Sequence, residues 1–344
     1  MKYKGRKKLS IKQKVLIAIS SILCLVLIAG LCGYLYLNSM INKVNFQNLS
    51  SNNSAAPNKD TTDNFGNPLM ADRDVLNVLL VGLDNREDTT EGGRSDSMII
   101  LSLNQKTKRI IMTSIMRDTY VPIAGHGSNR LNSAYSFGGM NLLISTIQKN
   151  FDIKINRYVT VDFAKFINIV DQLGGVEIEV SDKEVPVLNN YVAEINRIQK
   201  KPLKDGAISH GGKLLLNGKQ ALAYSRIRYV GNADFERTHR QRIVLNTIFN
   251  KLKQQNVLQL TSLLNTILPE ITTDLTQDEL RGLVLNSLTY KNYDIVQNRI
   301  PIDGSYTGKK INGMDVLVVD FDKNIESLKT VIFGTSLSPN KQSM

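Results

Sequence analysis

The sequence predicts an α/β fold in which a mixed central β-sheet is sandwiched by helices, in three layers α-β-α, preceded by one transmembrane helix. Two observations predict the layers. Short apolar runs rich in β-branched residues indicate buried strands, and segments whose apolar residues recur at helical spacing lie between them. Strands interleaved with helices are typical of a sheet covered by helices. A third observation, a long uncharged run near the N-terminus, predicts the transmembrane helix.

The transmembrane helix is predicted over residues 15–37. It follows a basic tail, residues 1–14, that holds seven Lys or Arg and no acid. At about 1.5 Å per residue the apolar run would be about 35 Å long, enough for a hydrocarbon core of about 30 Å. A cleaved signal peptide is the alternative, but its apolar region is usually only about 7–15 residues. Because basic residues stay on the cytoplasmic side, we expect the tail in the cytoplasm and the rest of the chain outside the cell membrane.

The part outside the membrane is predicted to be one domain with loose ends. Residues 38–71 are rich in Asn, Ser, Asp and Thr and indicate a flexible extracytoplasmic stalk, residues 72–335 form the globular domain, and residues 336–344 form a loose tail. Both cysteines lie in the predicted transmembrane helix, so the domain needs no disulfide. The basic tail supplies seven of the net +12 charges, so the remainder is only mildly basic. This distribution and the expected location weigh against a nucleic-acid partner.

Inside the domain the expected elements follow in chain order. Strands are expected at residues 74–84, 97–104 and 108–116, where apolar β-branched runs are bounded by turn residues. A helix is expected at residues 140–151, after a Gly-Gly pair, and another at residues 161–175, where a second Gly-Gly pair marks the end. The remaining expected elements are a strand at 176–180, helices at 238–255 and 276–288, and strands at 294–302 and 315–321.

One short region is dense in arginine. It contains Arg226, Arg228, Arg237, Arg240 and Arg242. At about 100° per residue, the apolar face of the helix that follows runs back through Gln241 and Arg237, while Arg242 falls on the opposite, solvated side. An arginine on a core-facing stripe needs a partner because an unpaired buried charge is costly. That partner is either an anion at the helix start or a salt bridge to Asp234 or Glu236. Asp234 either caps the helix or takes part in chemistry.

The spacing of these arginines favours a compact anion. Arg226 and Arg228 are two residues apart, so in an extended segment they point to the same side. With Arg237 they could surround a diphosphate, because each guanidinium offers a planar fork that suits phosphate oxygens. Single-stranded nucleic-acid sites usually add aromatic residues for stacking, but the chain has no Trp and only Tyr229 and Phe235 lie near the arginines.

Charged residues also gather at the ends of the first three predicted strands. Asp84 ends the first strand, and Arg94 and Asp96 precede the second. The third ends in Arg117 and Asp118. Ligands of α/β folds gather at strand ends. Two interpretations stay open: ordinary salt bridges, or two Asp carboxylates that hold Mg²⁺, which takes hard oxygen ligands and shares its shell with phosphates.

Several motifs in order carry a family resemblance. Between Leu76 and Gln255 the chain contains NVLLVGLD, GRSDSMI, IMRDTYV, NRLNSAYSFGG and the block SRIRYV…DFERTHRQR. Together with the predicted topology, they resemble the LytR–CpsA–Psr family of membrane-anchored cell-wall glycopolymer ligases. The resemblance implies an extracytoplasmic phosphotransferase of a Gram-positive-type envelope. It would move a teichoic acid, capsule or other wall polysaccharide from an undecaprenyl-diphosphate carrier to peptidoglycan, forming a phosphodiester, with pyrophosphatase as a side activity.

The resemblance also implies roles for individual residues. Asp84 and Asp96 match acids associated with Mg²⁺ or Mn²⁺. The residues that match the diphosphate-binding set are Arg94, Arg117, Arg226, Arg228, Arg237 and Gln241. Asp234 matches a candidate proton acceptor, and with Arg228 and Arg237 it makes up the expected catalytic set. Further along the same resemblance, Arg130 and Asn132 fall where the family keeps a basic-Leu-Asn element, in which lysine is the more usual basic residue.

A polyprenyl tail would need an apolar slot. The helix faces offer Leu142, Leu143, Ile147, Phe163, Phe166, Ile167, Val170 and Ile248, and the alternative for each is plain core. The expected partners are a lipid-linked glycopolymer, peptidoglycan and membrane lipid. Two other functions stay open: a transcriptional regulator or attenuator, for which no helix-turn-helix pattern is found, and a non-catalytic glycan-binding scaffold of the wall.

Overall fold

The computed structural model describes residues 31, 33–47, 68–84, 94–228, 230 and 233–334. The predicted basic tail and loose C-terminal tail, and most of the predicted transmembrane helix and stalk, therefore lie outside the described residues. Residues 33–41 are helical. Within the described ranges, no helix combines the length and the apolar character needed to cross a membrane.

In the described part of the chain, seven strands form the central sheet in the order β1-β10-β7-β2-β3-β4-β11. Their bounds, in that order, are Asn45–Phe46, Thr272–Thr273, Arg157–Asp162, Val75–Asp84, Arg94–Asn104, Arg109–Ile115 and Asp294–Ile300. β3 is antiparallel to both β2 and β4, whereas β7 pairs with β2 and β11 pairs with β4 in parallel. The predicted mixed central sheet is therefore confirmed, and its three expected N-terminal strands are β2, β3 and β4.

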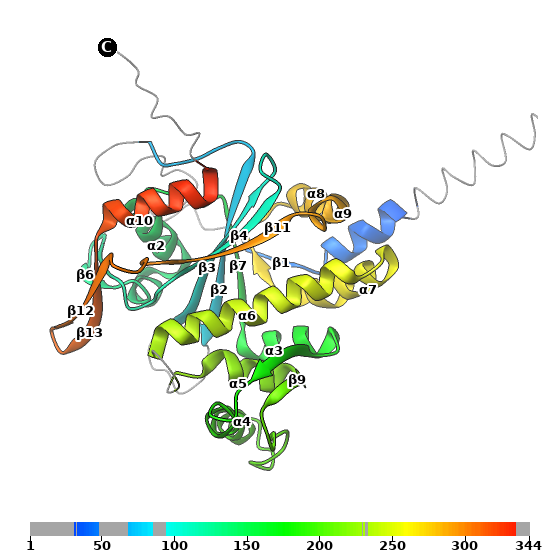
Figure 1. Cartoon of the computed structure of the whole chain (residues 1–344). Helices are drawn as coiled ribbons and strands as arrows, with labels where there is room; N and C mark the ends of the chain where they lie inside the picture. The colour runs from blue at the N-terminus through cyan, green and yellow to red at the C-terminus, as the bar shows by residue number, and fades with distance from the viewer. Residues whose placement is uncertain are drawn as a thin grey trace, which may run out of the picture.

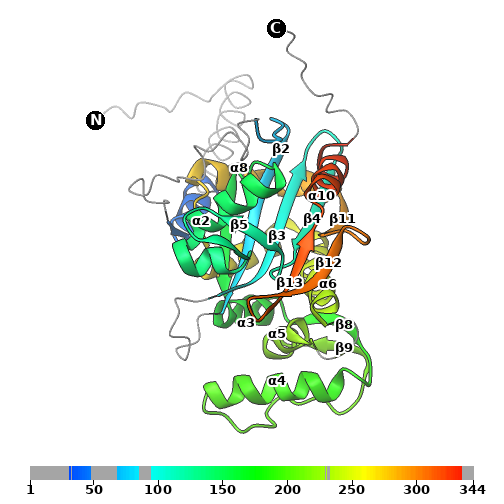
Figure 2. The same cartoon turned by 90° about the vertical axis from the view of Figure 1, so that its left-hand side faces the viewer.

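Helices pack on both faces of this sheet (Figures 1 and 2). The helices are α2 Ser133–Phe151, α3 Phe163–Gln172, α4 Val185–Ile198, α5 Gly218–Arg226, α6 Ala233–Gln254, α7 Val257–Ile267, α8 Gln277–Leu285, α9 Ser287–Tyr290 and α10 Phe321–Leu328, with a 3-10 turn at Leu268–Glu270 and a π-helical turn at Lys329–Phe333. Side chains alternate along β7: Tyr158 packs into the core cluster with α2 and α10, and Val161 packs into the cluster with α3 and α6. Each face therefore has its own hydrophobic core.

Within the described residues, three two-stranded ladders lie outside the central sheet. They are β5 Tyr120–Ile123 with β6 Gly127–Arg130, β8 Val176–Val180 with β9 Gly212–Leu216, and β12 Tyr306–Ile311 with β13 Met314–Val319. The predicted strands at 176–180 and 315–321 are present as β8 and β13, but neither joins the central sheet. An alternating apolar pattern identifies a strand with one buried face and carries no information about its partner.

Two helices begin earlier than their apolar periodicity predicts. α6 begins at Ala233, five residues before the expected start, because its first turn carries Asp234 and Glu236. Acidic residues suit a helix N-terminus but do not show up in an apolar pattern. α2 begins at Ser133 and is interrupted at Gly138 and Gly139, where φ is −150° and 63°. The expected helix is its second half.

The eight apolar residues considered for a lipid slot do not share one surface. Three lie on α2 and belong to its core cluster; the other five lie on α3 and α6 and belong to the second cluster. Leu143, Ile147 and Val170 are fully buried. A single slot lined by all eight is therefore wrong, since the two clusters pack against opposite faces of the sheet.

Candidate active site

A β-bulge places Asp96 at the site. β2 and β3 pair in register up to Ser97 and resume at Ser95, so Asp96 is left as the extra residue. Bulges re-aim side chains and are common beside active sites. One rung further along, Asp84 at the end of β2 pairs with Arg94 at the start of β3, and Asp84 is 5% exposed. The acids predicted to meet at these strand ends therefore lie on neighbouring strands.

Two arginines from different elements hold Asp96. Arg117, just after β4, donates from Nη1 to Asp96 Oδ1 at 2.6 Å. Arg237, near the start of α6, donates from Nη2 to the backbone carbonyl of Asp96, and the same nitrogen lies 3.6 Å from Oδ1. Burial tends to raise the pKa of Asp96, but the positive charges of Arg237 and Arg117 hold it below its usual value. Asp96 is therefore ionised at neutral pH.

Asp234 lies at the centre of the same cluster. Its Oδ2 accepts a hydrogen bond from Arg228 Nη2 at 2.7 Å. Its Oδ1 lies 3.7 Å from Arg117 Nε and 3.7 Å from Arg237 Nη1. Burial tends to raise the pKa of Asp234, and the arginines, Arg117 foremost, bring it below its usual value. Oδ1 is buried and accepts no hydrogen bond within the described structure.

The arginines of the cluster lie close enough to repel one another. Arg237 is buried, and its burial and the neighbouring Arg117 lower its pKa. The buried Nε of Arg117 makes no hydrogen bond among the described residues. A cluster of guanidinium groups that repel one another would be stabilised by a multiply charged anion.

Asp118 belongs to the site, although sequence reasoning gave it no role. It is 14% exposed, and its carboxylate lies 3.6 Å from Arg117 Nε and 3.5 Å from Arg130 Nε. Burial raises the pKa of Asp118, and the negative charge of Asp234 beside it adds to this rise. The only signal in the sequence was its position after Arg117 at a strand end. Nothing there indicates that Asp234, more than a hundred residues later, would lie next to it.

Arg226 lies at the edge of the arginine cluster, where its charge helps to lower the pKa of Asp96 but its guanidinium has other contacts. We expected Arg226 and Arg228 in one extended segment, which is wrong because Arg226 is the last residue of α5. Its Nη2 donates to Glu194 Oε1 at 3.1 Å, and its guanidinium packs over the rings of Phe163 and Tyr191. Of the pair, Arg228 alone makes a direct contact with Asp234.

Arg240 and Arg242 also differ from the simple helical projection. Arg242, expected on the solvated side, is 8% exposed, so that expectation is wrong. α6 is packed on more than one side, which a projection with a single apolar face does not anticipate. Arg240 is buried and donates to Glu184 at 2.6 Å and to the backbone carbonyls of Ile227 and Val230. It thereby ties the segment that carries Arg228 to α6.

Four other predicted residues lie around this cluster. Gln241 is half-buried, one turn after Arg237 on α6. Arg94 opens β3, and its side chain lies outside what the structure describes. Arg130 reaches Asp118, as above, and its Nε also donates to a backbone carbonyl at 3.0 Å. Asn132 is 8% exposed at the start of α2. The structure thus brings Asp96, Arg117, Arg228, Asp234 and Arg237 into direct contact and leaves the others at the margin.

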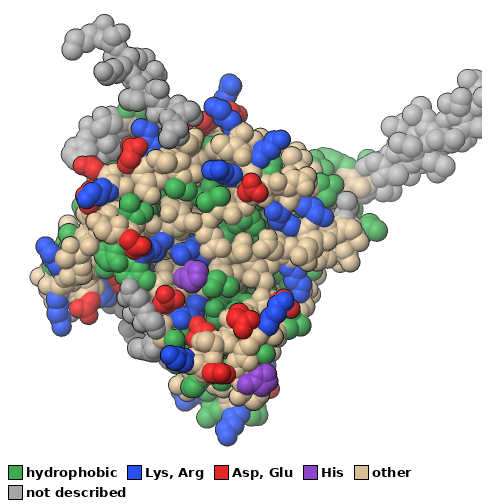
Figure 3. All heavy atoms as spheres, viewed as in Figure 1, with side chains coloured by type: hydrophobic (Ala, Val, Ile, Leu, Met, Phe, Trp, Pro, Cys, Tyr) green, Lys and Arg blue, Asp and Glu red, His purple; other side chains and the backbone are tan. Residues whose placement is uncertain are grey.

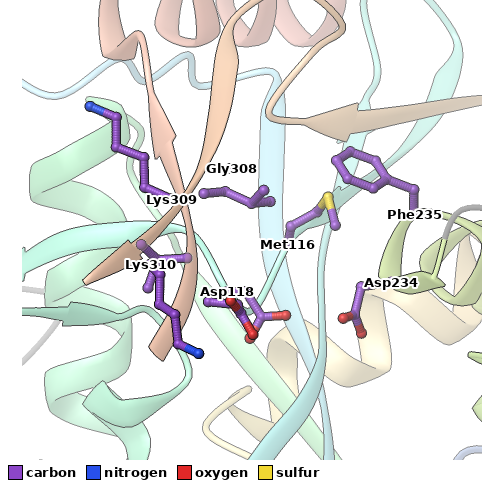
Figure 4. Close-up of a pocket in the computed structure, with 10 residues that line it drawn as sticks. Met116, Asp118, Asp234, Phe235, Gly308, Lys309 and Lys310 are labelled. Carbon is purple, nitrogen blue, oxygen red and sulfur yellow. The ribbon is translucent and has the colours of Figure 1, made fainter. Parts of the chain in front are cut away.

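A pocket of about 350 Å³ opens beside the two carboxylates (Figure 4). It is lined by Met116, Asp118, Asp234, Phe235, Gly308, Lys309, Lys310, Asp315, Val316 and Leu317. Its far wall is the β12–β13 hairpin. In the space-filling view, blue and red side chains are interspersed over the visible face, and no basic stripe of the kind that tracks a nucleic acid appears there (Figure 3).

The described residues offer only part of the ligand shell that a divalent metal needs. Among the described residues, no group of three or more His, Cys, Asp or Glu could hold a metal. Asp84 and Asp96 supply two hard oxygen donors on adjacent strands. Mg²⁺ commonly takes one or two carboxylates and completes its shell with water and substrate phosphates, so this donor set fits it.

Comparisons with known proteins agree with this fold. The model of the LytR_cpsA_psr family matches residues 34–331. The polyisoprenyl-teichoic acid–peptidoglycan teichoic acid transferase TagU of Bacillus licheniformis is 30% identical over 318 residues, which cover 91% of this chain and 92% of TagU. A structure of TagT bound to LI-WTA is 25% identical, with a TM-score of 0.59 and coverage of 76% of this chain and 92% of that one.

A second solved structure supports the fold alone. It is the LytR-CPS2A-psr family protein YwtF (TagT) with bound octaprenyl pyrophosphate lipid, 24% identical with a TM-score of 0.56, covering 77% of this chain and 93% of that one. The family model spans most of the sequence, and the TagU alignment runs nearly end to end in both proteins. The chain is therefore a member of the LytR_cpsA_psr family.

Proposed function

We propose that this protein is a membrane-anchored, extracytoplasmic phosphotransferase that moves a glycopolymer from an undecaprenyl-diphosphate carrier to peptidoglycan, leaving a phosphodiester between them. The glycopolymer is a teichoic acid, capsule or other wall polysaccharide. The name of the TagU relative supports the transferase class. The octaprenyl pyrophosphate held by YwtF (TagT) indicates that this fold can accommodate a polyprenyl diphosphate. The uncharged run after a basic tail supports the anchor and the location outside the cell.

The observation that carries the proposal is the convergence of Arg117, Arg228 and Arg237 around Asp234 and Asp96. They come from the end of β4, the segment before α6, and α6 itself. With Arg130 and Asp118 counted, four guanidinium groups face three carboxyl groups, which leaves an excess of positive charge. A diphosphate, with several anionic oxygens in a small volume, matches that excess and the planar donor forks.

The arrangement suggests how the reaction proceeds. A peptidoglycan sugar hydroxyl attacks the phosphorus that bears the glycopolymer, and the bond from this phosphorus to the bridging oxygen of the diphosphate breaks. Asp234 takes the hydroxyl proton, and polyprenyl monophosphate leaves. The arginines stabilise the charge that develops on the phosphoryl oxygens and on the leaving phosphate, the usual main contribution of a protein to phosphoryl transfer.

Asp84 and Asp96 would hold a Mg²⁺ or Mn²⁺ ion in this proposal. The ion would neutralise part of the charge on the diphosphate oxygens. Asp96 has a second task, because its Oδ1 also positions Arg117. A substitution of Asp96 would therefore affect both the metal ion and the position of Arg117.

The test uses the full-length protein and a labelled polyprenyl-diphosphate glycopolymer. Arg228→Ala should lower the rate of transfer to peptidoglycan by about 100-fold or more, the usual loss for one preorganised donor. Arg228 is 35% exposed, so its loss should leave the fold intact. Arg109→Ala, which removes an exposed arginine at the start of β4, should transfer at the normal rate. Normal transfer by Arg228→Ala would contradict the assignment of the site. Activity that is unaffected when a chelator removes divalent metal would contradict the metal requirement.

A further inference from the structure

The pocket against the β12–β13 hairpin adjoins the carboxylates of the cluster but not its arginines. Asp234 contacts Arg117, Arg228 and Arg237. None of these arginines lines the pocket, whereas Asp118 and Asp234 do. A diphosphate needs the arginines, so it belongs on their side. The pocket is then free for the second substrate of the transfer.

The hairpin is fixed beside the carboxylates by backbone contacts. The amide of Leu317 donates to the carbonyl of Asp118 at 2.9 Å, and Thr119 and Leu317 form a parallel bridge. Arg130 Nε, which lies 3.5 Å from Asp118, donates to the carbonyl of Asp315 at 3.0 Å. β12 and β13 therefore form a stable wall of the pocket at this point.

The rung of the hairpin nearest to Asp118 carries a lysine. Asp315 pairs with Lys310 across the ladder, so the contact of Arg130 with Asp315 places the Lys310 rung at the Asp118 end of the pocket. The Lys310 side chain is exposed and makes no ion pair within the described residues. In Figure 4 it extends to the side of the view where Asp118 lies, while Lys309 extends the other way.

An aromatic residue completes the pocket on the side of α6. Phe235 follows Asp234 directly, and its ring stacks on Tyr306 of β12 at 4.9 Å between centroids. The guanidinium of Arg299 lies 4.4 Å from the centre of the same ring. These contacts fix the ring, which gives the pocket a rigid apolar wall beside its carboxylates. Apolar walls with a few placed polar groups are typical of sites for small organic groups such as a sugar ring.

We propose that this pocket is the acceptor subsite, and that it takes an anionic saccharide: a hydroxyl of the acceptor reaches the carboxylate of Asp234 while a carboxylate of the same acceptor pairs with Lys310. The proposal rests on the proposed function, because it names where the acceptor of that transfer binds. The hydroxyl oxygen forms the new bond to phosphorus, its proton passes to Asp234, and polyprenyl monophosphate departs on the arginine side. Asp234 thus stands between the two substrates.

The test measures binding separately from transfer. Full-length protein is titrated calorimetrically with soluble peptidoglycan glycan fragments whose carboxyl groups are free, and with the same fragments after the carboxyl groups are amidated. Lys310→Glu should weaken binding of the free-acid fragment about 10-fold or more, since it replaces an attraction with a repulsion. The amidated fragment should bind wild type and Lys310→Glu equally. Lys106→Glu makes the same charge change at an exposed turn residue outside the pocket and should bind as wild type does.

Equal binding of the free-acid fragment by wild type and Lys310→Glu would overturn the subsite, as would no binding by wild type. The same preparations are then assayed for transfer from a labelled donor. If the wild-type protein transfers the glycopolymer and Lys310→Glu still binds the acceptor as well as wild type does, the subsite is refuted but the phosphotransferase activity is not. Carboxylate-dependent binding through Lys310 without any transfer refutes the phosphotransferase and leaves a glycan-binding site.

Discussion

Arg117 donates a hydrogen bond of 2.6 Å to Asp96, and this pair links the end of β4 to the bulge of β3. Both side chains are largely buried, at 16% and 23% exposure. The pair therefore contributes to the stability of the fold as well as to the shape of the candidate site. Removing one charge leaves the other uncompensated, which costs more than the pair itself contributes.

The first prediction concerns the stability that Asp96 supplies. Asp96→Asn should lower the free energy of unfolding by about 1–3 kcal/mol at pH 7, because Arg117 and Arg237 lose their anionic partner. The pKa of Asp96 is lowered in the folded state, so this stability is present above the unfolded value and is lost as pH falls through the folded one. Denaturant unfolding of the full-length chain at pH 7 and at about pH 3 measures the difference.

The control for this prediction is another aspartate paired with an arginine. Asp278 contacts Arg281 but is 90% exposed, so Asp278→Asn should change the free energy of unfolding by less than about 0.5 kcal/mol. Equal effects of the two substitutions at pH 7 would mean that the Asp96 pair is no stronger than a surface pair.

The second prediction contrasts Asp118 with Asp234. Asp118 has a raised pKa and Asp234 a lowered one, so their charges have opposite effects on folding. Asp118→Asn should leave the protein as stable as wild type at pH 7, or more stable by up to about 1 kcal/mol, because ionisation of Asp118 costs stability as pH rises. Asp234→Asn should destabilise it at pH 7 and lose this effect in acid. Thermal unfolding from pH 3 to pH 8 gives both profiles. If the two substitutions changed the stability in the same direction at pH 7, the two carboxylates would share one environment.

The sequence predicts the sheet and part of the site because those parts rest on local patterns. The apolar β-branched runs that become β2, β3 and β4 are buried on both faces and leave little ambiguity. Helical phase correctly placed Arg237 on the buried side of α6. Both results follow from the period of a single element.

What the sequence could not predict depends on contacts between distant segments. The meeting of Asp118 with Asp234 needs the β4 end and the α6 start in one place, and no local pattern encodes that. The β12–β13 hairpin lines the pocket although its strands carry no motif. Arg226 was misplaced because α5 extends to that residue, where spacing alone suggested an extended segment. The transmembrane helix, the metal and the cellular location remain predictions.

The third prediction concerns the buried Arg242. Its Nε and Nη1 make no hydrogen bond within the described residues, and it is 8% exposed. Burial and the positive charge of Arg299 lower its pKa to about 10. A buried cation without a partner costs stability, so Arg242→Met, which keeps a long apolar side chain, should raise the free energy of unfolding by about 1–3 kcal/mol at pH 7.

The gain from Arg242→Met should depend on pH with a definite sign. A base with a lowered folded pKa destabilises the fold fully below that value, and the penalty is relieved as pH rises through about 10 toward the unfolded value. Denaturant unfolding from pH 7 to pH 11 should therefore show the variant's advantage shrinking at the alkaline end. Arg109→Met, at an exposed position, should stay within about 0.5 kcal/mol of wild type throughout. A destabilised Arg242→Met would instead show that this guanidinium has a partner in the working protein, and a loss of transfer in the same variant would identify that partner as substrate.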